Sequence, residues 1–430
     1  MGTVPLTHGP VPYLIAAIGA VAIAWLAAVR GRRWWLRRVP AGAVVAAAAT
    51  AGLVFVVEKV WRPFPDALPT TVVLAAGGAL LALSLAALRW QFTRGWWRAV
   101  IPVASVLALV AAGSQINVYY GEYPTVDSLL PGPLANEVQL DRLHRPSSVV
   151  AAPPGKGLAS VWQAPATMPA HGATASVTIP PLKSGFRARP ASIYLPPAYL
   201  SSPRATLPVL VLMSGSPGSP HDWFGAGLLA ERMDRFAAAH DGLAPVVVVP
   251  DVLGSALANP LCMDSKLGKA ATYVDEDVPA WITANLQVDT DTAHWAIAGL
   301  SSGGTCALQA AIRSPKTYPT FVDISGQDEP TLGGRARTIK ATFGGDTAAF
   351  EAALPLNQLA GKSLPGSSGM LTVGDKDKMY GPQQRHVERA LQQAGVPVKF
   401  VLIRGAHTWA VFGAALEKSL AWLATRSGLA

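Results

Sequence analysis

The pentapeptide Gly299-Leu300-Ser301-Ser302-Gly303 has the G-x-S-x-G pattern, in which a serine sits on a sharp turn between a strand and a helix. The preceding residues, HWAIA, predict the strand, and the following residues, GTCALQAAI, predict the helix. The two glycines leave space for the strand and the helix to cross. The helix N-terminus favours negative charge that develops beside the serine. Ser301 is therefore predicted to be the nucleophile of an acyl-transfer reaction.

A serine nucleophile needs a general base, and eight histidines are candidates. His407 follows the last predicted strand, in VLIRGAHTW, and precedes a final predicted helix. In enzymes with the chain order Ser, Asp, His, the base occupies this position. We therefore predict that His407 is the base, and His221, in a Gly/Pro-rich loop after an early strand, could also line the site.

The base needs a carboxylate partner that orients its ring. The segment GMLTVGDKDK predicts a strand that ends at Gly374 and is followed by Asp375 and Asp377. We favour Asp377, because a Gly-x-x-Asp turn carries the carboxylate just beyond the end of the strand. Asp375 is the alternative.

Backbone N–H groups are expected to stabilise the oxyanion of the reaction. One donor should be Ser302, directly after the nucleophile. The other should come from the loop Ser214-Gly215-Ser216-Pro217-Gly218, which follows the predicted strand PVLVLM. Pro217 has no N–H, so Ser216 is the predicted donor.

Eight short, β-branched runs that end in Gly, Pro or Asp predict the strands that position these residues. They cover residues 175–180, 191–197, 207–215, 244–251, 294–301, 320–326, 369–375 and 398–405. Helical segments are predicted at residues 226–239, 303–312, 382–394 and 410–425. Apolar strands that alternate with helices predict an α/β fold, a mostly parallel sheet with helices on both faces.

Four apolar runs, at residues 13–29, 41–57, 70–88 and 99–118, are long enough to cross a bilayer. Tryptophans stand at the ends of these runs, as in the aromatic belts of membrane proteins. Residues 1–12 contain no Lys or Arg, so the first run is not predicted to be a cleaved signal peptide. We expect residues 1–120 to form a four-helix transmembrane anchor, 121–170 a Pro/Gly-rich connector, and 171–430 the catalytic domain.

The net charge of +9 is concentrated in the first 120 residues, which hold ten Lys or Arg and two acids. These basic residues flank the apolar runs, which argues against nucleic-acid binding and for a topology signal. Five arginines lie between runs one and two, and three lie between runs three and four. Positive loops stay in the cytoplasm, so we expect a multi-pass protein of the cell membrane with an extracytoplasmic catalytic domain.

Cys262 and Cys306 are too few for a zinc module, and no metal or organic cofactor is implied. Two buried free thiols are one possibility, and a disulfide is the other if the domain lies outside the cytoplasm. We predict the disulfide, because the loop after VVVVPD should reach the same edge of the sheet as the nucleophile turn.

The segments LPVLVLMSGSPGSPHDW, GLSSGGTCAL, TVGDKD and RGAHTW resemble the esterase D family of α/β hydrolases over roughly residues 170–430. That family includes the secreted mycolyltransferases of actinobacteria. INVYYGEYPTVDSLL also resembles the stretch that joins a four-helix anchor to the esterase domain in membrane-bound members. The resemblance implies the α/β-hydrolase fold and a triad of Ser301, an acid and His407. The mycolyltransferases use Glu as the acid, whereas this chain offers Asp.

We therefore expect a membrane-bound serine esterase or acyltransferase whose substrate is an ester of a lipid or cell-envelope component. One alternative is an aminoacyl-phospholipid hydrolase. Another, from a different class, is a catalytically inactive, membrane-tethered binding module, because a fold alone does not prove function.

Overall fold

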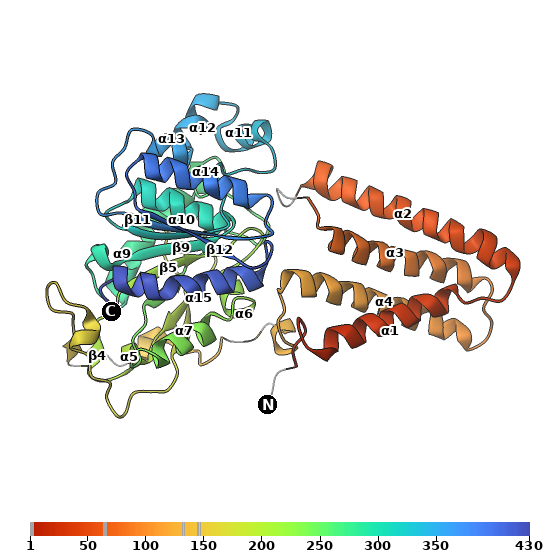
Figure 1. Cartoon of the computed structure of the whole chain (residues 1–430), viewed down its shortest axis with the longest axis horizontal. Coiled ribbons are helices and arrows are strands. Elements are labelled where there is room, and N and C mark those ends of the chain that lie inside the picture. Colours follow the sequence, from red (N-terminus) through yellow and green to blue (C-terminus); the bar gives the residue numbers. More distant parts are fainter. Residues whose placement is uncertain (1–3, 63–66, 131, 133, 144–145, 147) are drawn as a thin grey trace. The chain divides into compact units, whose positions relative to one another are not determined.

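The computed structural model of the chain describes residues 4–62, 67–130, 132, 134–143, 146 and 148–430. The chain divides into two compact units, Met1–Pro131 and Gly132–Ala430 (Figure 1). The first unit is helical, and the second contains a sheet with helices on both faces.

The first unit contains four long helices: α1 (Pro10–Ala27), α2 (Val39–Phe55), α3 (Thr70–Trp90) and α4 (Trp97–Tyr120). Short π-helical segments extend α2 at both ends, so that one continuous helical span covers Trp34–Trp61. All four spans are long and apolar enough to cross a membrane, as the four apolar runs of the sequence predicted.

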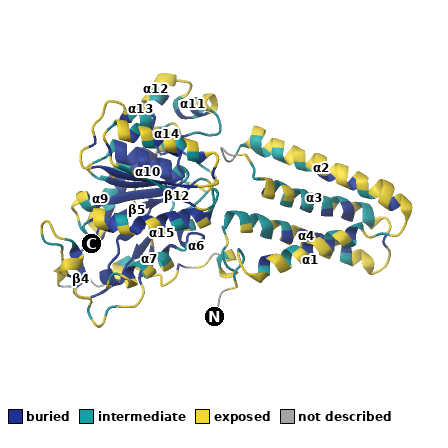
Figure 2. Ribbon diagram, viewed as in Figure 1, coloured by how far each residue is buried: buried dark blue, intermediate teal, exposed yellow. Residues whose placement is uncertain are grey.

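The bundle buries small side chains, such as Ala22, Ala82 and Ala104, where the helices approach one another. Its outer surface is apolar, and Leu14, Val44 and Leu74 are exposed. Figure 2 shows exposed residues along most of α2, whose span is only 11% buried. Exposed apolar helices of this kind suit a bilayer rather than water, so the first unit indicates membrane anchoring.

The second unit is built on one eight-stranded sheet in the order β12-β11-β10-β9-β5-β6-β3-β2. Neighbouring strands are parallel from β12 to β6, whereas β3 is antiparallel to both β6 and β2. β12 is Val398–Ile403, β11 is Ser368–Gly374, β10 is Thr320–Ile324 and β9 is Ala296–Leu300. β5 is Val209–Met213, β6 is Val246–Val249, β3 is Ala191–Leu195 and β2 is Ala173–Val177. Two short pairs lie outside this sheet: β1 (Val149–Val150) with β4 (Arg204–Ala205), and β7 (Asp264–Ser265) with β8 (Gly268–Lys269).

Helices cover both faces of the sheet (Figure 1). On one face, α9 (Val278–Asn285), α10 (Ser302–Arg313) and α14 (Tyr380–Gln393) share a core with β-strand residues such as Val211 and Val248. On the other face, α7 (Leu229–Ala238) and α15 (Trp409–Arg426) pack on residues such as Leu210 and Leu212. The remaining helices are α5 (Pro197–Leu200), α6 (Asp222–Gly225), α8 (Ala270–Thr272), α11 (Arg335–Phe343), α12 (Thr347–Ala353) and α13 (Pro355–Leu359).

Residues that precede β2 also belong to the second unit. Leu158 and Trp162 are buried in the core that contains α10. The Trp162 indole donates a hydrogen bond to the Asp241 carbonyl (2.8 Å), and the Leu158 N–H donates to the Gly428 carbonyl (2.9 Å). This segment therefore joins the start of the unit to its C-terminal end.

The predicted α/β fold is confirmed, since the eight predicted strands form the sheet and run mostly parallel. The largest shift is at β2, which ends at Val177, although the predicted run continues to residue 180. Helices α11 to α13 were not predicted, because the segment 335–359 breaks into short pieces without a long apolar period.

A disulfide joins Cys262, in the loop after β6, to Cys306 in α10, with the two Cα atoms 5.3 Å apart. Both residues are buried. The bridge ties a loop at the carboxyl edge of the sheet to the helix that Ser302 opens.

Replacement of both cysteines by alanine should lower the free energy of unfolding of the second unit. The disulfide closes a loop with a sequence separation of 44 residues, which corresponds to about 4 kcal/mol in a chain-entropy estimate. Pulse proteolysis in urea would measure the loss, and reductant should lower the stability of the unmodified protein by the same amount. Two thiols that alkylate freely without reductant would contradict the bridge.

Candidate active site

Ser301 lies on a sharp turn between β9 and α10, with backbone angles φ 54° and ψ −122°. A positive φ is unusual for a residue with a side chain and is typical of the nucleophile turn of α/β hydrolases. The turn depends on its glycines, because a Cβ at Gly299 would lie 2.2 Å from the Gly303 carbonyl oxygen. A Cβ at Gly303 would lie 2.4 Å from the Ser214 carbonyl oxygen.

Hydrogen bonds hold the Ser301 backbone on both sides. Its N–H donates to the Ile324 carbonyl at the end of β10 (2.8 Å), and its carbonyl accepts from the Thr305 N–H (3.0 Å). Ser302 is the first residue of α10, where N–H groups have no acceptor within the helix. The Ser302 N–H is therefore positioned to donate to an oxyanion at Ser301.

His407 and Asp377 are in direct contact at the carboxyl ends of β12 and β11. The Nδ1 atom of His407 is 2.9 Å from Oδ2 of Asp377, and the carboxylate side chain is only 3% exposed. The other carboxylate oxygen accepts from the Tyr380 N–H (3.0 Å). This arrangement assigns the proton of the neutral imidazole to Nδ1 and leaves Nε2 free to act as a base.

Aromatic side chains hold the imidazole on two sides. The Tyr380 ring stacks on His407 with the ring centroids 4.3 Å apart, and the Phe412 ring meets it edge-on at 4.9 Å. These contacts, together with the bond to Asp377, restrict rotation of the His407 ring. A fixed ring reduces the loss of entropy in a proton-transfer step.

Asp375, the alternative acid, has a different partner. Its Oδ1 accepts from the N–H of Gly405 (2.8 Å) and so ties the loop after β11 to the loop after β12. Gly374 is required at this crossing, because a Cβ there would lie 2.5 Å from the Gly405 carbonyl oxygen. Asp375 therefore supports the loop that carries His407, whereas Asp377 contacts the imidazole.

The loop after β5, which carries Ser216, packs against the nucleophile turn. A Cβ at Gly215 would lie 2.7 Å from Leu300 Cδ1 and 3.2 Å from Ser301 Cβ. The missing side chain of Gly215 thus lets this loop lie close to Leu300 and Ser301. Parallel strands β5 and β9 are neighbours, so their carboxyl ends meet at this edge of the sheet.

A partly buried ion pair, which the sequence analysis did not predict, stabilises the same loop. Arg189 forms a two-pronged contact with Asp251 (2.9 and 2.8 Å) and donates to the Gly218 carbonyl (2.8 Å). Asp222 accepts from both the N–H (2.7 Å) and the hydroxyl (2.6 Å) of Ser219. Arg189 and Asp251 are distant in sequence, and neither belongs to a motif, so only the fold brings them together.

His221 and Asp323 lie near these elements, but neither belongs to the predicted triad. His221 lines a cavity of about 260 Å³ together with Arg189, Ser219 and Pro220. Asp323, near the end of β10, is fully buried and accepts from the Gln384 side chain (2.9 Å). Burial raises the pKa of Asp323 to about 7, against the opposing effect of hydrogen bonds from Gln384 and Gly326.

A serine on a strained turn, a histidine–carboxylate pair and free helix N–H groups, all at one edge of the sheet, provide the groups needed for acyl transfer. Within the described residues, no group of three or more His, Cys, Asp or Glu side chains could hold a metal ion.

Comparisons with known proteins agree with this acyl-transfer chemistry. A family model described as "Putative esterase" matches residues 186–423. An uncharacterized protein of Corynebacterium glutamicum is 38% identical over 421 residues, which cover 96% of this chain and 95% of that protein. A ferulic acid esterase of known structure is 20% identical with a TM-score of 0.51, covering 59% of this chain and 97% of that one. An S-formylglutathione hydrolase from Agrobacterium tumefaciens has a TM-score of 0.48 at 20% identity, covering 59% and 95% of the two chains.

The family model spans more than half of the chain, including the strands and helices that carry Ser301, Asp377 and His407. The likeness to the ferulic acid esterase shows the same fold. The C. glutamicum relative matches along almost the whole length, so the likeness includes the membrane-anchoring helices. The chain therefore belongs to the esterase family of α/β hydrolases and is a serine carboxylic-ester hydrolase.

Proposed function

We propose that this esterase works outside the cytoplasm, as a hydrolase or acyltransferase, on an ester of a lipid or cell-envelope component. Ser301, His407 and Asp377 form its triad. The observation that carries the proposal is the 2.9 Å contact between His407 and the buried Asp377 carboxylate, at the same sheet edge as Ser301. A membrane-tethered binding module that had lost its chemistry would have no need for this arrangement.

In the proposed reaction, the Ser301 hydroxyl oxygen attacks the ester carbonyl while His407 Nε2 takes the hydroxyl proton. Asp377 stabilises the imidazolium through Nδ1, and the Ser302 and Ser216 N–H groups donate to the oxyanion. The C–O bond to the leaving alcohol then breaks, and His407 returns the proton to that alcohol. Water, or the hydroxyl of an acceptor, attacks the acyl-enzyme by the same steps and releases Ser301.

The proposed location and substrate class rest on the first unit. We assign residues 1–120 to a membrane anchor, 121–170 to a connector and 171–430 to the catalytic domain. The arginine-rich loops between helices one and two, and three and four, support a cytoplasmic position for those loops. Tethering raises the effective concentration of the enzyme toward esters in or near the same membrane.

Ser301→Ala should lower ester turnover by about 10⁴- to 10⁶-fold, because members of a triad act as a unit. Ser302→Ala is the matched control. It keeps the backbone N–H and removes only a buried hydroxyl that has no partner among the described residues. Turnover of a chromogenic short-chain ester by purified protein would measure both variants. Full turnover by Ser301→Ala would remove Ser301 from the mechanism.

Asp377→Asn should cost on the order of 10⁴-fold in kcat, because an amide in this position favours the wrong tautomer of His407. Asp375→Asn should cost less than about ten-fold, since its remaining amide oxygen can still accept the Gly405 N–H and a hydrogen bond of this kind contributes about 1 kcal/mol. The ranking of the two kcat values is the measurement. The opposite ranking would assign the acid to Asp375.

Alkaline phosphatase fused after residue 430 should be active, and a fusion within the Arg30–Arg38 loop should be inactive, because the phosphatase folds only outside the cytoplasm. Green fluorescent protein at the same positions should give the reverse pattern and serves as the control. A fluorescent, phosphatase-negative fusion at residue 430 would place the catalytic domain in the cytoplasm and contradict the proposal.

A further inference from the structure

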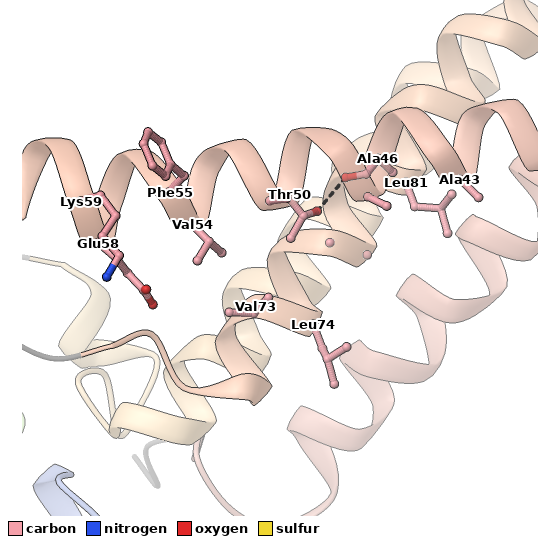
Figure 3. A pocket seen from close by; sticks show the side chains of 14 residues that line it. Ala43, Ala46, Thr50, Val54, Phe55, Glu58, Lys59, Val73, Leu74 and Leu81 are labelled. Atoms are coloured by element: carbon pink, nitrogen blue, oxygen red, sulfur yellow. Dashed lines mark hydrogen bonds between the residues drawn. The ribbon is translucent and has the colours of Figure 1, made fainter. Parts of the chain in front are cut away.

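An apolar groove of about 770 Å³ runs between α2 and α3 in the membrane-anchoring unit (Figure 3). Ala43 and Leu81 lie at one end of the groove, and Glu58 and Lys59 lie at the other. From Ala43 to Lys59 the wall formed by α2 extends about 24 Å at 1.5 Å per residue. This length approaches the ~30 Å hydrocarbon layer of a bilayer, so the groove is matched to a long apolar occupant.

The walls offer almost no polar group to a ligand. Thr50 contributes a hydroxyl, but that hydroxyl already donates to the Ala46 carbonyl (2.7 Å), as the dashed line in Figure 3 shows. The other residues between the ends are Ala, Val, Leu, Phe and Gly. An occupant of this part of the groove must therefore be hydrocarbon.

The polar end is different, because two charged side chains, Glu58 and Lys59, line it. Glu58 Oε1 accepts from the Leu68 N–H (2.9 Å), which ties the carboxylate to the start of the segment leading into α3. The Lys59 amine has no hydrogen-bond or ion-pair partner among the residues that the structure describes. The described part of the chain thus leaves this ammonium group open to a ligand at the end of an apolar groove.

We propose that this groove binds one acyl chain of a lipid with an anionic headgroup, whose phosphate lies against Lys59. The acyl chain fits the hydrocarbon walls, and the headgroup supplies a negatively charged partner for Lys59. Helices α2 and α3 approach closely within the groove, because a Cβ at Gly77 would lie 3.4 Å from Thr50 Oγ1. That closeness favours a single chain over the 10–12 Å cylinder of a helix from a second copy.

Two glycines provide a matched pair of variants. Both Gly78, which lines the groove, and Gly52, which is exposed on α2 outside it, would carry a Cβ with no atom within 4 Å. Gly78→Leu should therefore start its side chain in open space within the groove, whereas Gly52→Leu adds the same side chain to the lipid-facing surface. Ala47→Phe fills the groove from the opposite wall and replaces Gly78→Leu if that variant fails to fold.

The test uses full-length protein carrying Ser301→Ala, reconstituted in phosphatidylcholine vesicles with a phosphatidylglycerol probe that has a diazirine midway along one acyl chain. Labelling is read from the mass of the adduct and not from turnover, so the outcome is independent of the esterase proposal. After illumination, mass spectrometry should find adducts concentrated on the groove residues of α2 and α3. Gly78→Leu should remove most of them, and Gly52→Leu should leave them unchanged.

The headgroup is tested by a matched phosphatidylcholine probe. The phosphatidylglycerol probe should label the groove more than the phosphatidylcholine probe does. Lys59→Gln should reduce the ratio of the two labelling yields by about five-fold, the contribution of one basic residue near an anionic lipid. Lys59→Arg should retain the preference. Equal labelling of all lipid-facing helices, or a groove that labels only by cross-linking to a second copy of the chain, would overturn the proposal.

Discussion

The backbone at Ser301 has a positive φ, which costs on the order of 1–3 kcal/mol for a residue with a side chain. The strand–helix crossing that enforces it needs Gly299 and Gly303, and it needs the loop after β5 to come close at Gly215. The Arg189–Asp251 pair then fixes that loop. Much of the second unit can thus be understood as the support that keeps one serine in a strained conformation.

The sequence predicted those features that local patterns encode. The eight strands follow from β-branched runs and turn residues, and the four membrane helices follow from apolar length. Ser301, Asp377 and His407 could be selected because each follows a strand in the order expected for this chemistry. The sequence favoured Asp377 but kept Asp375 as the alternative, since both follow Gly374. In the structure, Asp377 contacts His407 and Asp375 contacts Gly405.

Other features depend on contacts between residues that are distant in sequence, and no local pattern predicts them. Arg189 meets Asp251, and Asp323 meets Gln384, only because the sheet brings their strands and helices together. The burial that raises the pKa of Asp323 has the same origin. The groove between α2 and α3 also depends on how the two helices pack, although Lys59 and the glycines that line it are visible in the sequence.

The two units are adapted to different solvents: one exposes apolar side chains, whereas the other buries them on both faces of a sheet. We propose Ser301 as the nucleophile of this enzyme. Native membranes that contain the full-length protein should be treated with a fluorophosphonate and the adduct mapped by mass spectrometry. If Ser301 is the nucleophile, one adduct should form, on the peptide that contains Ser301. An adduct at another residue, or none in folded protein, would contradict it.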